Sequence, residues 1–390
     1  MAAEKNNKTL NVPNLRFPEF SEEWEKVPLS QIATRVTRKN KNNATRLPLT
    51  ISAQHGLVDQ VTFFNKVVAS SDMSNYYLLH RGEFAYNKSY SGDYPWGAIK
   101  RLDRYDQGAL SSLYICFAPT DIIDSDFLVH YFESPKWHRE VSNIAGEGAR
   151  NHGLLNIAVP DFFNTQHSIT TNKKEQRKIA DFLNLIDERI ETQRRIIEDL
   201  KKLKRAICKS VFTSPECVTR KMDDIATVTM GQSPSSRSYN DNQQGLPLIQ
   251  GNLDLYDGRI RPRIYTSEIT QTCKKGDVIL TVRAPVGEIA HAQLTACIGR
   301  GVCTISPHTS SDAELIYQFL NYYKPTWTKL EQGSTFSSIN GADIRGIAVR
   351  CPSMSKIKLL QLLDARLQAS VCLLNAYSVS KDCLLSQLFI

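Results

Sequence analysis

The residues of this chain offer little that could carry out catalysis. No GxGxxG or GxxxxGK segment is present to hold a phosphate, no HExxH or CxxC pair suggests zinc, and no N-P-P or D-P-P start suggests an amino-methyltransferase. Pro160-Asp161 with Asp199-Leu200-Lys201 loosely imitates a nuclease carboxylate set, but Asp199 and Lys201 fall in a helical heptad repeat whose charges normally face solvent. We therefore predict a chain without catalytic residues, metal or cofactor.

Side chains suited to nucleic acid are more frequent. Binding DNA requires cations for phosphates, and forked or amide side chains for base edges. Loops of this type occur at matching places in the two halves of the chain. The candidate DNA-binding residues are Arg38, Lys39, Gln54, His55, Asn87, Lys88, Tyr90, Lys100, Arg101, Arg150, Asn151, His152, Arg237, Gln250, Asn252, Arg259, Arg261, Arg263, Arg283, Ser334 and Thr335. Any single loop could be an ordinary solvated loop, and the matching positions are what favour the group.

Composition agrees with this interpretation without requiring it. The chain has 390 residues and a net charge of +8, which permits nucleic-acid binding. Residues 24–140 carry 14 Lys and Arg against 12 Asp and Glu, and residues 218–350 carry the same numbers, so a DNA surface must come from local clusters. The first residues lack the apolar core of a signal peptide, no run is apolar enough to span a membrane, and nine cysteines without metal spacing suggest a reducing cytoplasm.

The elements that must position these loops occur twice. Three of the matches are Leu47-Pro48-Leu49 with Leu246-Pro247-Leu248, Arg81–Tyr86 with Lys275–Leu280, and Phe127–Phe132 with Leu315–Leu320. The matches keep their order over the chain, which indicates a duplicated globular module. Within a module, short alternating runs predict strands and the Phe127–Glu133 and Ala313–Tyr323 runs predict helices.

Each module is followed by a long heptad repeat. The expected seam residues are Ile179, Leu183, Ile186, Ile190, Ile197 and Leu200 in the first helix, and Leu360, Leu363, Leu367, Leu374, Leu384 and Leu388 in the second. Gln193 and Lys204 interrupt the first seam, and Ser370 and Lys381 interrupt the second. Two such seams predict an antiparallel coiled coil within one chain, although each helix could instead pack separately on a globular core. Asn172 and Glu175 predict a capping box at the first helix.

These patterns predict an α+β protein with two duplicated globular recognition domains separated by two long antiparallel coiled-coil helices. The expected boundaries are a loose polar arm over 1–23, a first domain over 24–170, a central helix over 171–215, a second domain over 216–352 and a C-terminal helix over 353–390.

The duplicated module, the segment RFPEFSEEWEKVPLSQIA and the helix segment EQRKIADFLNLIDERI together resemble the specificity subunit of type I restriction-modification systems. The resemblance covers essentially the whole chain. It implies that each domain is a target recognition domain for one half of a bipartite double-stranded DNA site. It also implies that the helices set the spacer and dock methyltransferase subunits, two in number, and that restriction subunits join the larger complex in the cytoplasm. Methylation and cleavage would then reside in other chains.

The resemblance is weaker in the second half, which lacks a Glu-Gln pair before its helix, and Asp187 aligns best with Asp364. Two other classes stay open from the residues alone. One is the recognition portion of a self-contained restriction-methyltransferase, which the missing methyltransferase motifs disfavour. The other is a coiled-coil scaffold that does not bind DNA.

Overall fold

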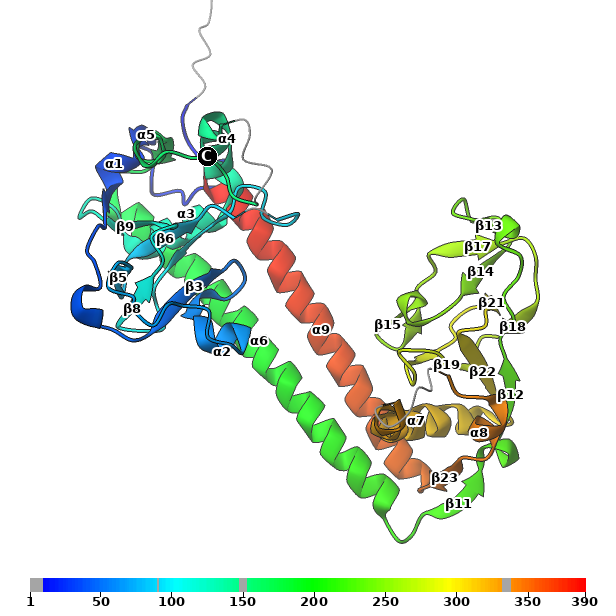
Figure 1. Cartoon of the computed structure of the whole chain (residues 1–390). Coiled ribbons are helices and arrows are strands. Elements are labelled where there is room, and N and C mark those ends of the chain that lie inside the picture. Colours follow the sequence, from blue (N-terminus) through cyan, green and yellow to red (C-terminus); the bar gives the residue numbers. More distant parts are fainter. Residues whose placement is uncertain (1–9, 90, 147–152, 332–337) are drawn as a thin grey trace, which may run out of the picture. The chain divides into compact units, whose positions relative to one another are not determined.

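The computed structural model describes residues 10–89, 91–146, 153–331 and 338–390. The chain forms two compact units. Unit 1 comprises residues 1–192 and 374–390, and unit 2 comprises residues 193–373. Two long helices, α6 (Lys173–Thr213) and α9 (Met354–Leu388), each contribute one part to each unit. Figure 1 shows both helices and the labels used below.

Unit 1 is built on two four-stranded sheets. One has the order β2-β9-β6-β7 and the other β4-β3-β8-β5. Its strands are β1 (Glu25–Pro28), β2 (Ala33–Arg35), β3 (Pro48–Ser52), β4 (Gly56–Asp59), β5 (Tyr77–His80), β6 (Phe84–Asn87), β7 (Ala98–Arg101), β8 (Gln107–Leu110), β9 (Ile115–Pro119) and β10 (Gln166–Ile169). Its shorter helices are α1 (Leu29–Ile32), α2 (Gln60–Phe64), α3 (Ser125–Glu133), α4 (His138–Ile144) and α5 (Val159–Asn164). The β1 and β10 strands pair antiparallel, with Glu25 opposite Ile169.

Unit 2 has a six-stranded sheet, β12-β22-β19-β20-β16-β15, and a five-stranded sheet, β13-β17-β14-β21-β18. Its strands are β11 (Val218–Lys221), β12 (Ala226–Met230), β13 (Tyr239–Asn240), β14 (Leu246–Ile249), β15 (Leu255–Tyr256), β16 (Arg259–Ile260), β17 (Ile264–Thr266), β18 (Gln271–Cys273), β19 (Val278–Thr281), β20 (Ile289–His291), β21 (Ala296–Ile298), β22 (Val302–Pro307) and β23 (Ala348–Cys351). Two helices, α7 (Ser310–Glu331) and α8 (Gly341–Arg345), complete it. The β11 and β23 strands pair antiparallel, with Val218 opposite Cys351.

The duplication is visible in the strand order. The β2-β9-β6-β7 arrangement of unit 1 recurs as β12-β22-β19-β20 in unit 2, and both sheets are antiparallel throughout these pairs. The matched segments Arg81–Tyr86 and Lys275–Leu280 lead into β6 and β19, which hold equivalent places. A parallel pair also recurs, β3 with β8 and β14 with β21. The predicted fold class, α+β with a duplicated domain and two long helices, is confirmed.

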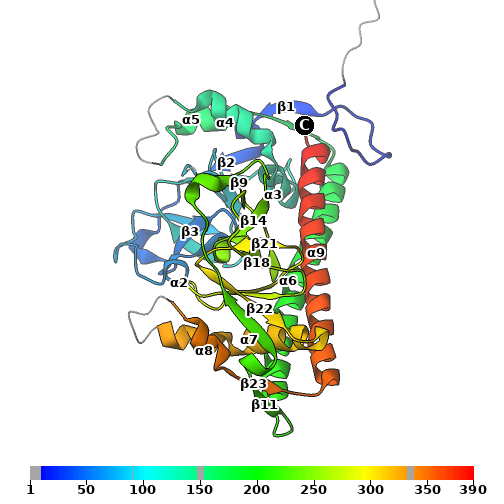
Figure 2. The ribbon, with the colours of Figure 1, turned by 90° about the vertical axis from the view of Figure 1, so that its right-hand side faces the viewer.

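The α6 and α9 helices run antiparallel inside each unit. In unit 1, Lys381 of α9 donates to Asp187 of α6 at 2.5 Å. In unit 2, Lys204 of α6 donates to Asp364 of α9, and the amide of Gln193 donates to the carbonyl oxygen of Ser370 at 3.0 Å. The helices lie side by side in the turned view of Figure 2. Each expected seam residue is buried or half-buried, so the apolar stripe faces the partner helix or a domain core.

The start of α6 is fixed by different contacts from those expected. Asn172 caps the helix, because its side-chain oxygen accepts from the amide of Lys174 at 3.0 Å. Glu175 does not complete a capping box. Its buried carboxylate instead accepts two hydrogen bonds from Arg16, at 2.6 and 2.9 Å. Lys178 pairs with Glu19, so residues 10–23 dock on α6 and the expected loose arm is wrong for these residues.

The core of unit 1 includes the end of α9. Leu385, Leu388 and Phe389 are buried together with Trp24 and Phe127 in one cluster. The Phe389 ring lies 5.3 Å from that of Phe127, edge to face. The C-terminal helix is therefore part of the first domain's core.

Candidate nucleic-acid interface

In unit 1, most of the predicted DNA-binding cations contact groups of their own unit. Arg38 donates to both carboxylate oxygens of Glu83 at 2.7 Å. Lys39 donates to the carbonyl oxygen of Asn75 at 2.8 Å and lies over the Tyr77 ring.

The cations near α3 are engaged as well. Lys100 lies 3.6 Å from Glu133, and Arg101 pairs with Asp103 and Asp126 at 2.6 and 2.8 Å. Such paired side chains have less free charge for phosphates. These ion pairs connect the sheet to α3. The sequence alone does not distinguish this structural role from DNA binding.

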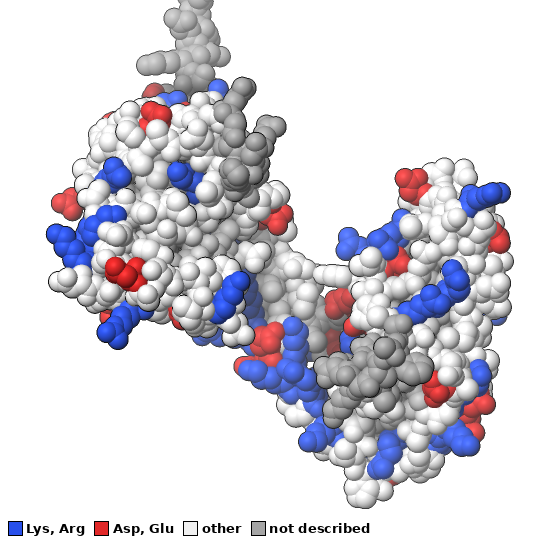
Figure 3. All heavy atoms as spheres, viewed as in Figure 1, with Lys and Arg blue, Asp and Glu red and all other residues white. Residues whose placement is uncertain are grey.

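The predicted polar loops of unit 1 lie at strand ends. Gln54 and His55 lie in the turn between β3 and β4. Asn87 ends β6, where its side chain accepts from the amide of Ser89 at 3.0 Å, and Lys88 follows it. Six predicted residues lie outside the described ranges: Tyr90, Arg150, Asn151, His152, Ser334 and Thr335. On the face shown in Figure 3, Lys and Arg side chains are dispersed over each unit.

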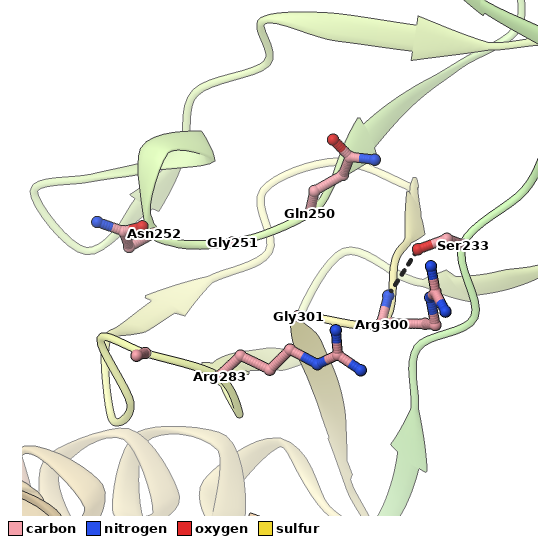
Figure 4. Close-up of a pocket in the computed structure, with 8 residues that line it drawn as sticks. Ser233, Gln250, Gly251, Asn252, Arg283, Arg300 and Gly301 are labelled. Carbon is pink, nitrogen blue, oxygen red and sulfur yellow. Dashed lines mark hydrogen bonds between the residues drawn. The ribbon is translucent and has the colours of Figure 1, made fainter. Parts of the chain in front are cut away.

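Unit 2 brings three predicted residues together in one pocket. Gln250, Asn252 and Arg283 line it with Ser233, Gly251, Ala284, Arg300 and Gly301, around a cavity of about 190 Å³. Figure 4 shows the guanidinium group of Arg283 extending toward Arg300. The described residues that line the pocket include two arginines and no acidic residue, which makes it positively charged. It can donate hydrogen bonds to an anion or to the acceptor edge of a base.

Glycines allow the segments around the pocket to approach closely. A methyl group on Gly301 would lie 1.9 Å from the carbonyl oxygen of Gln250, and one on Gly231 would lie 2.1 Å from that of Gly299. The turn is also bonded in place. The amide of Gly299 donates to the carbonyl oxygen of Ile249 at 2.8 Å, and that of Arg300 donates to the Ser233 hydroxyl at 3.1 Å. The backbone that carries Arg300 is therefore fixed.

The other predicted arginines of unit 2 lie elsewhere. Arg263 pairs with buried Asp254 at 2.9 Å, and Asp254 also accepts from the amide of Gln250 at 2.8 Å. Arg259 and Arg261 line a second hollow with Gln368, Ala369 and Cys372 of α9. Arg237 is exposed in the short helical turn Ser236–Ser238.

Sequence reasoning missed Arg300 and Ser233. The available signal was the run Gly299-Arg300-Gly301 between two apolar strands, because a charged residue between two glycines in a tight turn is presented outward. No matching basic loop exists in the first half, so the comparison of halves did not select it.

An ionic cluster lies between α3, α6 and α9 in unit 1. Potential metal ligands of His130, Glu133 and Asp187 lie within 4.8 Å of one another. The ammonium group of Lys381 contacts both carboxylates, at 2.7 Å from Glu133 and 2.5 Å from Asp187. Burial opposes the charge of Lys381, but the two carboxylates outweigh it and raise its pKa. A lysine at this place repels a cation, so the cluster acts as an ion-pair network that joins the helices to the domain.

Comparisons with known proteins agree with this architecture. Residues 215–368 match the family described as type I restriction modification DNA specificity domain. A curated relative of Methanocaldococcus jannaschii, named "Putative type I restriction enzyme MjaX specificity subunit", is 30% identical over 205 residues. That alignment spans 47% of this chain and 48% of the relative, so the chain matches about half of the relative's length.

Solved structures share the fold over nearly the whole chain. The S subunit of a type I restriction-modification system from M. genitalium has a TM-score of 0.62 at 17% identity, covering 97% of this chain and 99% of that one. A chain from a study of complex assembly and conformational transition of the type I R-M system has a TM-score of 0.58 at 21% identity, covering 93% and 94%.

These findings define the class of protein that the chain resembles. Residues 215–368 of unit 2 match the family described as type I restriction modification DNA specificity domain. The chain resembles the specificity subunits of type I systems, in sequence over about half its length and in fold over nearly all of it, as the sequence led us to expect. Among the described helices, none combines the length and the apolarity that a membrane crossing needs.

Proposed function

We propose that this chain is the non-catalytic, sequence-specific DNA-binding subunit of a type I restriction-modification complex. Each globular domain binds one half of a bipartite duplex target, and the α6–α9 pair sets the distance between the halves. The observation that carries this proposal is the duplication itself. Two domains share the strand order of their main sheets but differ in their polar loops, as expected if a common frame reads two different half-sites.

Equivalent exposed apolar residues support docking of two methyltransferase subunits. Phe182 and Leu185 of α6 are 36% and 61% exposed, and Leu359 and Leu362 of α9 are 45% and 68% exposed. When Asp187 is aligned with Asp364, Phe182 aligns with Leu359 and Leu185 with Leu362. Each unit therefore offers a similar apolar strip, and two similar strips fit two copies of one partner. Restriction subunits would join through that core complex.

Exchange of one domain tests whether each domain recognises its own half of the target. The paired strands β11 and β23 bring the ends of the second domain side by side, so residues 218–351 can be replaced by the equivalent residues of another specificity subunit. The hybrid is co-expressed with the methyltransferase subunits, and the methylated sequence is determined by methylome sequencing. We expect one half of the target to change and the other to stay. A change in both halves, or methylation by the purified chain alone with S-adenosylmethionine, would contradict the proposal.

Docking is tested on the strips separately. Leu185→Asp should reduce the number of methyltransferase subunits bound from two to one, measured by light scattering after size exclusion, and Leu362→Asp should do the same. The double variant should bind none. Asp181→Asn, a change at an exposed polar position of the same helix, serves as the control and should still bind two.

A further inference from the structure

The pocket of unit 2 is distinguished by the two arginine side chains that line it. Among the described residues, Arg283 and Arg300 form no ion pair, whereas Arg263 of the same unit pairs with Asp254 and Arg38 of unit 1 pairs with Glu83. Arg283 and Arg300 line the same pocket, and their like charges repel each other. An anionic ligand would remove that repulsion.

We propose that Arg283 and Arg300 clamp a single phosphate of the DNA backbone and thereby fix the register of unit 2 on its half-site. This inference rests on the proposed function of the chain as a DNA-recognition subunit. It assigns the two arginines a positioning role, so the choice of bases falls to other residues of the domain.

The donor arrangement favours a phosphate over a base. A guanine edge is bound by one arginine, which uses both of its forked donors on O6 and N7, so a second guanidinium would find no acceptor there. A phosphate presents acceptor oxygens on several sides, and both arginines can donate to it. The Ser233 hydroxyl accepts from the amide of Arg300 at 3.1 Å, which leaves its own hydrogen free to donate to the same group.

The backbone around the pocket is built to hold these donors in place. Gly301 fits against the carbonyl oxygen of Gln250 only because it has no side chain. On the other side of the pocket, the backbone of Arg283 forms an isolated antiparallel β-bridge with Ser338. The amide of Ile339 donates to the carbonyl oxygen of Val282 at 2.9 Å. Fixed backbones on both sides reduce the entropy lost when the two arginines bind one anion.

Gln250 is placed to work beside the clamp. Its side-chain amide nitrogen donates to the hydroxyl of Tyr239 at 2.9 Å, which orients the amide. Its carboxamide oxygen remains available as an acceptor. An amide next to a fixed phosphate contact can reach a base edge in a set register.

The test uses the full-length chain in complex with its methyltransferase subunits and a duplex containing the methylated target. Methylphosphonate linkages, which are uncharged, replace the phosphates of the second half-site one at a time. Wild-type affinity should fall about ten-fold or more at one linkage, as expected for the loss of a charged hydrogen bond. Arg283→Ala and Arg300→Ala should each weaken binding to the unmodified duplex and should each lose less affinity than wild type at that linkage, because one arginine remains. The double variant should lose no further affinity there. Each single variant should also lower the slope of log affinity against log salt by about 1.

Lys275→Ala is the matched control, because it removes an exposed charge from the same unit outside the pocket. It should keep the wild-type methylphosphonate profile. Thermal melting of all variants checks that they fold. A double variant that changes the methylated sequence at wild-type salt slope, or that keeps the wild-type loss of affinity at that linkage, would overturn the phosphate clamp. Failure of the wild-type complex to bind any duplex would instead overturn the proposed function.

Discussion

Lys204 of α6 donates a charged hydrogen bond to the carboxylate of Asp364 on α9. Gln318 of α7 donates to the other oxygen of that carboxylate at 2.5 Å, so Asp364 joins the helix pair to the second domain. The same arrangement occurs in unit 1, where Lys381 bridges Asp187 and Glu133. These polar positions interrupt both apolar seams. A lysine at such a position is stable only opposite its carboxylate, so the two pairs specify the antiparallel register of the helices.

Removing the lysine should therefore destabilise unit 2. The side chains of Lys204 and Asp364 are 17% and 24% exposed, so we expect Lys204→Met to cost roughly 1–3 kcal/mol, less than the ~3–5 kcal/mol of a fully buried pair. Urea unfolding followed by circular dichroism measures this. Lys202→Met, on the exposed face of the same helix, should shift the midpoint little. Equal midpoints for the two variants would show that the pair does not hold the register.

A methyl group at Gly301 should disturb the pocket without touching its charges. Because the added carbon would lie 1.9 Å from the carbonyl oxygen of Gln250, we expect Gly301→Ala to cost roughly 1–3 kcal/mol and to weaken DNA binding. Gly251 lines the same pocket but has no atom within 4 Å of such a carbon. Gly251→Ala should therefore melt and bind like wild type, and the comparison is made by thermal melting and fluorescence anisotropy with target DNA. Similar losses in both variants would argue against a clamped turn.

Stability of unit 1 should fall as pH drops from 6.5 toward 4. Burial lowers the pKa of His167 from 6.5 to about 4. The neutral ring fits its site, since Tyr131 lies 3.0 Å from Nδ1 and the Thr165 hydroxyl, which donates to Phe162, lies 2.8 Å from Nε2. Between these two pH values, His167 binds a proton in the unfolded chain but not in the folded one. Its contribution to the free energy of unfolding is therefore fully present above pH 6.5 and is lost as the pH falls toward 4. The full loss is roughly 3 kcal/mol.

Urea midpoints measured from pH 7 to pH 4 check this expectation. His167→Gln should flatten the pH dependence in that window, because the titrating group is gone. The exposed His80 provides the control, and His80→Gln should keep the wild-type slope. Should His167→Gln retain the full slope, another group controls the acid sensitivity.

Lengthening the helix pair should lengthen the DNA spacer. Four residues inserted after Arg195 in α6, with four more after Cys372 in α9, add about one helical turn and about 6 Å to each helix. The spacer between the half-sites should then grow by one or two base pairs, since B-DNA rises about 3.4 Å per pair. Methylome sequencing reads the new spacer. Insertion of two residues at each point rotates the apolar seam by about 200° and should abolish binding. If the four-residue variant methylates only the original spacing, the helices do not set it.

The sequence predicts the frame of this protein better than its binding surface. Heptad spacing is a local signal, and it predicts the buried positions of both helices because a helix pair must bury every third or fourth residue. Leu183 and Leu360, for example, are both fully buried. Charge is different, since a basic residue looks the same in sequence whether it faces solvent or a carboxylate. Arg101 and Arg283 were indistinguishable until the fold placed Asp126 beside one and no described carboxylate beside the other.

Unit 1 is discontinuous in the chain, and this affects the order in which the two units can fold during synthesis. Unit 2 is one continuous segment, residues 193–373, and all of its core residues are synthesised before α9 is complete. The core of unit 1 instead waits for Leu385, Leu388 and Phe389, which fill the space around Trp24 and Phe127. Domains usually fold in the order of their synthesis. Here the N-terminal domain reaches its full core last, after the domain that is translated behind it.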